Sequence, residues 1–377
     1  MPRMNVRAMV AAMAVTVLAG CGGGAAPAAS PSTAPASAAS PAASGKPAGS
    51  AAAPASGAAS AKPAASAAAS AAAKPAASGL TPLKGTFTTV SPTGGPLWAA
   101  KETGIFARNG LDVTLTSVQA TAAMPALTSN DVQFTSSGAA EVASLDLKGG
   151  QVVMVAEGAA LPIFSLFVDK KYKTVQDLAG QTIGVTSIGA ASDTVAHLFL
   201  RKYDMEDKVK ITGAGGSSPA ILAAMGQGLI AGGILIPPVT AKAEQQGYTE
   251  LINGVKLGVP YTQGSLTMTR SWAKDHATER DALLKSYLQA WQYVSDPANK
   301  ATMLKIFEQY TKSDAADSEV AYNFMLPLWQ SQKVPYMTDE AIKNVLQFLS
   351  DPAAAKADPK QFYDNSYLQA VAGEASK

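Results

Sequence analysis

The chain has 377 residues, of which 47% are hydrophobic and 15% are charged, and it contains one cysteine and two histidines. A single cysteine excludes an internal disulfide, and so few thiols and imidazoles argue against a zinc or iron–sulfur site. Five of the 30 basic residues and none of the 28 acidic residues precede residue 80, so the remainder carries a charge of about −3, which argues against nucleic acid as a partner.

The first twenty residues have the layout of a secretory signal. Arg3 and Arg7 precede an apolar run over 8–17, and small residues follow up to Cys21. The run is too short for a transmembrane helix, so we predict a signal peptide over 1–20 and an exported protein. The letters LAGC resemble the bacterial lipobox, which implies a lipid on Cys21 and a membrane anchor. A chance cysteine behind a plain secretory signal is the alternative.

The segment 21–79 that begins with this cysteine consists almost entirely of Ala, Ser, Pro, Gly and Thr, with charges only at Lys46, Lys62 and Lys74. Such a segment has little to bury, and its prolines interrupt helices, so we predict a disordered linker. A flexible chain of this length spans about 40 Å, which makes it a tether for the folded part. Binding of a cell wall or polysaccharide by the lysines is the alternative.

The folded part opens with a predicted strand–helix–strand unit. A β-branched, apolar run predicts a buried strand over 87–90, Pro96 suits the first turn of a helix, and 111–115 predicts a second strand. The loop SPTGG precedes the helix, where backbone N–H groups are unpaired and open α/β sheets bind their ligands. We therefore expect ligand contacts from Ser91, Thr93, Gly94 and Trp98.

The string PLWAAKETGIFARNGLDVTL resembles the opening segment of the solute-binding proteins of ABC importers for nitrate, alkanesulfonates, taurine or thiamine-precursor pyrimidines. The matching positions are Pro96, Leu97, Trp98, Ala100, Gly104, Ile105, Phe106, Gly110, Leu111, Asp112 and Val113. The resemblance implies a two-lobed α/β fold of the periplasmic-binding-protein type, with a mixed sheet flanked by helices in each lobe and a helical C-terminal region on lobe one. It also implies a small-molecule solute, an ABC permease as partner and a monomer. A strand–helix unit from an unrelated α/β protein is the alternative.

The rest of lobe one is predicted to contain helices over 122–129 and 139–147, with strands over 132–135, 152–156 and 163–168. The strand end before the second helix is rich in hydroxyls, so we expect ligand contacts from Ser136, Ser137 and Gly138. Helix capping alone is the alternative for these residues. Lobe one is expected to comprise 80–168 and 265–377, and lobe two 169–264, with crossings near 168–170 and 264–267.

Lobe two is predicted to begin with a capping-box-like turn at Thr174 and Asp177, followed by a strand over 182–185 and a helix over 195–203. This entry segment also resembles the entry to the second lobe in the same importer proteins. The loop before the helix offers hydroxyls and backbone N–H groups. We expect ligand contacts from Ser187, Ala190, Ala191, Ser192 and Asp193, with simple capping by Ser192 and Asp193 as the alternative.

A strand over 209–212, a helix over 220–226 and a strand over 233–236 are predicted to complete lobe two. The glycines after the first of these strands faintly resemble a dinucleotide-binding fingerprint. Ser218 replaces its last glycine, however, and prolines follow the next strand where an acid for the ribose is needed. We expect the site for a solute to be lined here instead by Gly216, Ser217, Pro237 and Pro238.

A strand over 266–269 is expected to return the chain to lobe one. Apolar residues at helical spacing from Leu283 to Val294, and again over 339–349, then predict helices that pack on this lobe. Such stripes form core, so Trp291 and Trp329 are assigned to packing and to no site.

No nucleophile elbow, phosphate-binding loop or zinc-protease helix occurs, so we expect no catalytic residue, no metal and no cofactor. The expected function is capture of a small organic solute outside the cell membrane and its delivery to the permease, without catalysis. A thiamine-pyrimidine-synthase-like enzyme of the same fold is one alternative, although the cysteine cluster it needs is missing. A ligand-sensing domain without transport is another.

The loops expected to line the solute site contain no Lys or Arg, and Asp193 is their only charge. An unpaired buried charge is costly, so these loops favour a neutral or singly charged organic solute. Its flat or apolar body is expected to lie against Trp98 and Pro237, while Ser137 and Ser192 fix its polar end. Packing of Trp98 in the core is the alternative.

Overall fold

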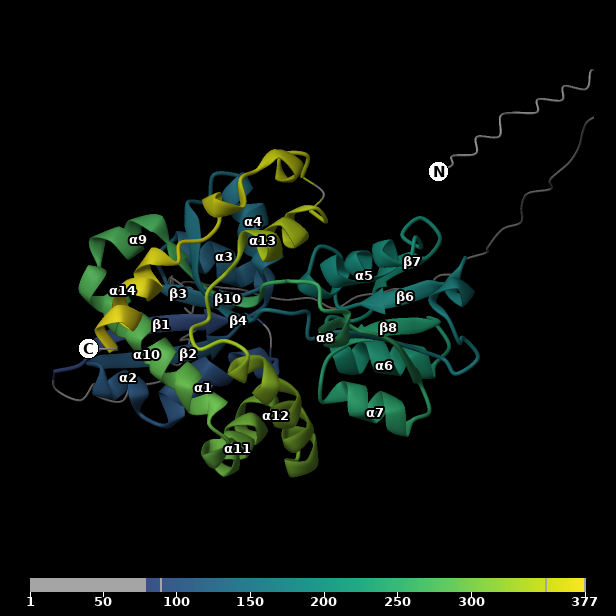
Figure 1. The fold of residues 1–377 in the computed structure, drawn as a ribbon, viewed down its shortest axis with the longest axis horizontal. Coiled ribbons are helices and arrows are strands. Elements are labelled where there is room, and N and C mark those ends of the chain that lie inside the picture. Colours follow the sequence, from purple (N-terminus) through teal and green to yellow (C-terminus); the bar gives the residue numbers. More distant parts are fainter. Residues whose placement is uncertain (1–78, 89, 350, 376–377) are drawn as a thin grey trace, which may run out of the picture. The chain divides into compact units, whose positions relative to one another are not determined.

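The computed structural model describes residues 79–88, 90–349 and 351–375. The expected signal peptide, Cys21 and the linker up to residue 78 lie outside this part, so their predictions are not tested by it. The described residues form two five-stranded sheets, each with its own helices (Figure 1). None of the helices in the described ranges is long and apolar enough to cross a membrane.

The first sheet has the strand order β2-β1-β3-β10-β4. Its members are β1 (Thr81–Phe87), β2 (Leu111–Ser117), β3 (Phe134–Ser137), β4 (Val152–Ala159) and β10 (Gln263–Thr269). The first three pair in parallel, whereas β10 runs antiparallel to both β3 and β4. The helices of this part are α1 (Gly95–Glu102), α2 (Ile105–Arg108), α3 (Ala120–Thr128) and α4 (Ala139–Leu147), with a 3-10 turn η1 (Pro92–Gly94) before α1.

The strand predicted over 87–90 lies earlier in the chain than the sequence indicated. β1 ends at Phe87, and it begins at Thr81 despite Pro82 and Gly85, which are residues that disfavour strands. Proline is tolerated because β3 pairs only with Gly85 to Phe87, so the first half of β1 has a neighbour on one side alone. The helix starting near Pro96 and the helix over 139–147 are confirmed.

The second sheet has the strand order β7-β6-β8-β5-β9, again with one antiparallel strand beside a parallel set. Its strands are β5 (Ser165–Val168), β6 (Thr182–Val185), β7 (Lys210–Gly213), β8 (Gly232–Leu235) and β9 (Thr249–Asn253). Its helices are α5 (Ala191–Lys202), α6 (Ser218–Gly226), α7 (Val239–Gln245) and α8 (Gly254–Leu257), with a 3-10 turn η2 (Val175–Leu178). The predicted capping box at Thr174 and Asp177 opens that turn.

The crossing between the sheets falls before β5, and this corrects the boundary expected at residue 168. β5 pairs with β8 and β9, so Ser165–Val168 belongs to the second sheet. The apolar run over 163–168 indicates a strand but carries no information about which sheet the strand joins. The chain crosses at 160–164 and returns over 254–262, and the two crossing segments lie side by side. Tyr261 N–H donates to the Ala160 carbonyl (3.0 Å), and Gly254 N–H donates to the Phe164 carbonyl (2.9 Å).

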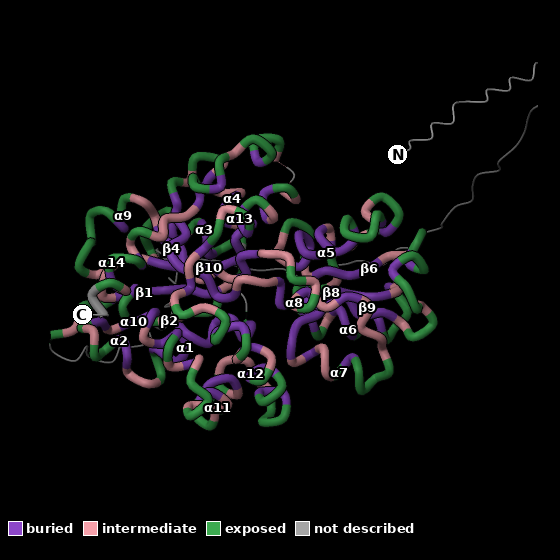
Figure 2. The backbone as a smooth tube through the Cα atoms, in the orientation of Figure 1, coloured by how far each residue is buried: buried purple, intermediate pink, exposed green. Residues whose placement is uncertain are grey.

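The C-terminal region is helical, and it packs on the first sheet and its helices, as expected. It comprises α9 (Arg270–Asp275), α10 (Ala277–Ser295), α11 (Lys300–Thr311), α12 (Ala315–Gln330), α13 (Asp339–Leu346) and α14 (Ser366–Ala375), with short 3-10 turns η3 (Pro297–Asn299), η4 (Ala354–Lys356) and η5 (Pro359–Gln361). Figure 2 shows buried residues concentrated along the sheets and the inner faces of the helices. Trp291 and Trp329 are fully buried, which confirms their assignment to core.

Candidate functional site

A band of buried hydroxyls crosses one face of the first sheet. The strand registers pair Thr86 with Thr135, Thr135 with Thr267, and Ser137 with Ser265, so these side chains share one face. Thr86 donates a hydrogen bond to the Thr135 hydroxyl (2.9 Å), and Ser265 donates to the Ser137 carbonyl (3.1 Å). The band ends at Ser137, whose buried hydroxyl has no hydrogen-bond partner. Sequence analysis noted only the last residues of β3, although alternating Thr and Ser in three strands carries this signal.

In the first predicted loop, SPTGG, hydrogen bonds form between residues of the loop itself. Ser91 Oγ accepts from Thr93 N–H (3.3 Å) and shares a hydrogen bond with the Thr93 hydroxyl (2.9 Å). Gly94 has to be glycine because a side chain here would collide with the Trp98 ring. Ser91, Thr93 and Gly94 are all buried.

Trp98 lies in the core of the first lobe, so the expectation that a solute lies against its ring is wrong for the described conformation. The indole is 0% exposed. It stacks on Tyr310 with centroids 4.8 Å apart, and it meets Phe87 and Phe307 edge-on. The sequence could not show this arrangement because Phe307 and Tyr310 lie on α11, some 200 residues away.

The N-terminus of α4 holds an acidic side chain that sequence analysis did not select. Glu141 stands at the third position of the helix, and its carboxylate lies over Gly138, the N-cap, where any side chain would collide with it. Burial raises the pKa of Glu141 to about 6, and the backbone N–H groups of Gly138 and Glu141 lower it only part of the way back. One carboxylate oxygen, Oε2, is buried without a hydrogen-bond partner.

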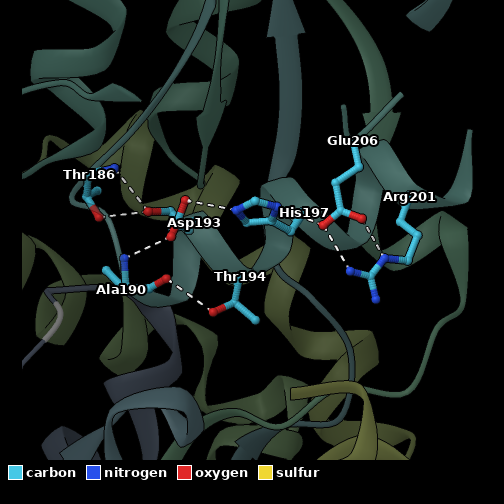
Figure 3. A network of polar contacts seen from close by, with 9 residues as sticks. Thr186, Ala190, Asp193, Thr194, His197, Arg201 and Glu206 are labelled. Atoms are coloured by element: carbon cyan, nitrogen blue, oxygen red, sulfur yellow. Dashed lines mark hydrogen bonds and ion pairs between the residues drawn. The ribbon is translucent and has the colours of Figure 1, made fainter. Parts of the chain in front are cut away.

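The N-terminus of α5 has a similar arrangement (Figure 3). Asp193 again stands at the third helical position, after an alanine N-cap with no capping side chain, and its Oδ2 accepts from Gly189 N–H (2.8 Å). Its Oδ1 has no hydrogen-bond partner and lies 3.7 Å from His197 Nε2. Ser192 bonds Thr186 N–H (3.0 Å) and the Thr186 hydroxyl (2.8 Å). These hydrogen bonds of Ser192 and Asp193 hold the loop and the helix together, as the capping alternative supposed.

Tyr261 connects these two helix ends. It lies in the returning crossing segment and is 0% exposed, and its hydroxyl has no well-formed hydrogen bond. Burial first and the nearby Glu141 carboxylate second raise the pKa of Tyr261, while the Thr194 hydroxyl on α5 lies close enough to lower it slightly. The phenol therefore stays protonated. Because α4 also packs beside α5, these groups lie together where the two sheets meet.

We call this place the junction, and we define it by five residues whose buried polar atoms lack a hydrogen-bond partner. These residues are Ser137, Glu141, Asp193, Tyr261 and Gln263. Buried polar atoms are almost always satisfied in folded proteins, so such a group of unpaired atoms indicates a place for water or a ligand. Two of the five were expected from the sequence, and the others come from a helix turn, a crossing segment and the first residue of β10, none of which carried a recognised signal.

The remaining predicted residues fall into two groups. Ser187, Gly216 and Ser217 are exposed, and Gly216 N–H donates to the Thr186 carbonyl (3.0 Å), so these two loops of the second lobe are joined. The partly buried residues are Ser136, Ala190, Ala191 and Pro238, and the buried ones are Gly138 and Pro237. Ser217 caps α6 by accepting a hydrogen bond from Ala220 N–H (3.4 Å). Gly138 adjoins the junction, because the Glu141 carboxylate lies directly over it.

Two contacts join the lobes away from the junction. Lys242 on α7 forms an ion pair with Asp317 on α12 (2.5 Å). On the other side, the Arg201 guanidinium lies over the ring of Phe348, 4.4 Å from its centroid. The same ring stacks on His197, and Glu206 contacts His197 Nδ1 (3.0 Å). In the ion pair the lysine is half exposed, whereas Asp317 is buried.

Comparisons with known proteins agree with this architecture. The family model described as NMT1/THI5 like matches residues 91–301 of the chain. The structure of a putative sulfonate ABC transporter component, the periplasmic sulfonate-binding protein SsuA from Methylobacillus flagellatus KT, is 15% identical, with a TM-score of 0.64 over 79% of this chain and 96% of that one. The periplasmic nitrate-binding protein NrtA from Synechocystis PCC 6803 is 14% identical, with a TM-score of 0.62 over 78% of this chain and 89% of that one.

The same fold also occurs in a protein named as an enzyme. The desulfurization enzyme DSZB is 13% identical, with a TM-score of 0.60 over 78% of this chain and 99% of that one. No curated protein sequence matches the chain. At these identities the similarity shows a shared two-sheet fold, and the solute has to be inferred from the residues of this chain.

Proposed function

The chain belongs to the NMT1/THI5-like family, and from that membership we propose that it is the solute-binding component of an ABC importer. It captures a small organic solute, of the sulfonate, taurine, nitrate or pyrimidine-type class, and delivers it to a membrane permease without chemical change. The observation that carries this proposal is the junction, where buried polar atoms from both lobes and a crossing segment lack partners. Neighbours of the same fold named as sulfonate- and nitrate-binding proteins support it.

Capture requires the lobes to separate and close. Within the described part of the chain, only two crossing segments connect the sheets, and they lie side by side through the bonds of Tyr261 and Gly254, which suits a hinge. The ion pair between Lys242 and Asp317 and the contact of Phe348 with α5 stabilise the closed arrangement from two sides. Since both are partly exposed, each contributes little energy and can open readily.

The protein is proposed to act as an exported monomer, anchored by lipid on Cys21 and held away from the membrane by the segment 22–79. The signal-like start and the LAGC sequence support the anchor. A tether of this composition lets the folded part reach a permease in the same membrane.

A thermal-shift screen of the full-length protein tests the binding function. The panel consists of nitrate, alkanesulfonates, taurine, pyrimidines, aromatic acids and amines, because any bound ligand raises stability by RT ln(1 + [L]/Kd). We expect at least one class to raise the unfolding midpoint in a concentration-dependent way and to reduce the radius of gyration in small-angle scattering. A panel without any stabilising solute, or a bound solute that leaves the radius unchanged, contradicts the proposal.

A further inference from the structure

The junction also carries information about the charge of the solute, an inference that rests on the proposed binding function. Helix N-termini present unpaired N–H groups and a positive partial charge, and they are therefore the usual places for an anion. In this chain the N-termini of both α4 and α5 already hold a carboxylate of their own. Glu141 and Asp193 stand at the third helical position, behind N-cap residues that have no capping side chain.

Each of these carboxylates uses the N–H groups that an anionic solute needs. Asp193 Oδ2 accepts from Gly189 N–H (2.8 Å), and Glu141 lies over Gly138 with that residue's N–H directed at it. A sulfonate or nitrate in this place would compete with Glu141 for the same donors and would also meet its negative charge. Two like charges close together repel, and the repulsion grows as water is excluded from around them.

The unpartnered atoms identify what the junction does accept. Glu141 Oε2, Gln263 Oε1 and Asp193 Oδ1 are acceptors without a donor, while the hydroxyls of Ser137 and Tyr261 are buried and unpaired. Ser137 is 2% exposed and Tyr261 is 0% exposed, so neither is satisfied by bulk water. Asp193 Oδ1 lies 3.7 Å from His197 Nε2, and Glu206 holds the other nitrogen of that imidazole. No described contact brings a lysine or arginine to Glu141.

We propose that the junction binds a solute through a positively charged, hydrogen-bond-donating nitrogen, such as an organic ammonium group or a protonated nitrogen heterocycle, and that Glu141 is the residue that determines this specificity. The nitrogen donates to Glu141 Oε2 and to neighbouring acceptors such as Gln263 Oε1. The Tyr261 and Ser137 hydroxyls contact the same end of the solute. Asp193 contributes negative charge from the second lobe, so closure of the lobes strengthens the attraction.

The test measures thermal unfolding of the full-length protein in 50 mM ethylammonium chloride, sodium ethanesulfonate or potassium chloride. The two organic probes share a two-carbon body and differ in the charge of the recognised end. Potassium chloride matches their ionic strength. We expect ethylammonium to raise the unfolding midpoint above that in potassium chloride, and ethanesulfonate to give no comparable rise.

Two variants assign the effect to the junction. Glu141→Gln keeps the shape and removes the charge, and we expect the apparent dissociation constant for ethylammonium to rise at least tenfold. Glu279→Gln is the matched control, because Glu279 also stands in the first turn of a helix, α10, and is not part of the junction. Tyr261→Phe removes one hydroxyl and is expected to weaken ethylammonium binding by a smaller factor.

Several outcomes overturn the inference. Equal midpoints in ethylammonium and potassium chloride, stabilisation by ethanesulfonate that matches or exceeds that by ethylammonium, or an effect of ethylammonium that persists in Glu141→Gln would each do so. The proposed binding function would be contradicted by a different result, namely that no solute of the wider panel binds. An anion that emerges as the best binder would leave the binding function standing and remove Glu141 as the determinant of charge.

Discussion

Glu157 on β4 gives a quantitative prediction about pH. Its side chain is 1% exposed, and it accepts hydrogen bonds from Gln332 Nε2 (2.9 Å) and the Thr262 hydroxyl (3.3 Å). Burial raises its pKa from 4.5 to about 7, and the two hydrogen bonds offset only part of this effect. Thr262 belongs to the returning crossing segment, so the carboxyl group ties β4 to the hinge.

A carboxyl group with a raised pKa in the folded state keeps its proton after the unfolded chain has lost it. Its contribution to the free energy of unfolding is therefore fully present below pH 4.5 and is lost as pH rises from 4.5 to about 7. A shift of this size corresponds to about 3 kcal/mol of unfolding free energy. The side chain of the variant Glu157→Gln stays neutral at every pH and can accept and donate hydrogen bonds at the same positions. The variant should therefore not lose stability as pH rises through this range.

The assay is urea unfolding of the parent and Glu157→Gln at pH 4.5, 6 and 8. We expect the variant to gain about 3 kcal/mol relative to the parent between pH 4.5 and pH 8. Because Glu141 titrates in part of the same window, only the difference between parent and variant reports on Glu157. The exposed residue Glu340, changed to Gln, controls for loss of a surface carboxylate. Parallel pH profiles of parent and Glu157→Gln would refute the assignment of this buried carboxyl group.

Three further experiments test other parts of the molecule. Trp98→Ala should destabilise the fold by about 3–5 kcal/mol in urea unfolding, because the indole fills the core against Tyr310; an unchanged midpoint would contradict this packing. A double-mutant cycle with Lys242→Met and Asp317→Asn should give a coupling energy below about 1 kcal/mol, since the lysine is half exposed, and a larger value would show that the pair is more than a weak latch. Cys21→Ser should move the protein from the membrane fraction to the soluble fraction with unchanged solute affinity, and continued membrane retention would exclude the lipid anchor.

Local features of the fold could be predicted from the sequence, whereas the assignment of strands to sheets could not. The helix over 139–147 and the capping box at Thr174 were predicted correctly because each depends on neighbouring residues. The strand over 163–168 was recognised, but its sheet was not, since pairing with β8 and β9 depends on residues more than sixty positions away. Trp98 shows the same limit, because its ring is buried partly by Phe307 and Tyr310 of α11, which lies outside its own strand–helix–strand unit.

The junction was only partly predictable for a related reason. Ser137 is the last residue of β3 and Asp193 lies in the first turn of α5, and both adjoin small polar residues at strand ends, which is the pattern that the sequence offered. Tyr261 lies in an irregular crossing segment, and a single tyrosine in such a segment has no periodicity that indicates its burial. Its proximity to both α4 and α5 arises only when the two crossing segments pair.

Glu141 is the residue whose local signal was present and overlooked. An acid at the third helical position ordinarily shares the helix end with a Ser, Thr, Asp or Asn at the N-cap, and the two satisfy each other's N–H groups. Here the N-cap is Gly138, which has no side chain to contribute, and the acid is partly buried, with its Oε2 atom out of contact with solvent. A glycine N-cap lets the carboxylate lie directly over the backbone, so one oxygen meets the N–H groups while the other is left unpaired. Substitution of Gly138 would displace the carboxylate, and the same short sequence, Gly-Ala-Ala-Glu, therefore both caps the helix and fixes a negative charge at the place where the two lobes meet.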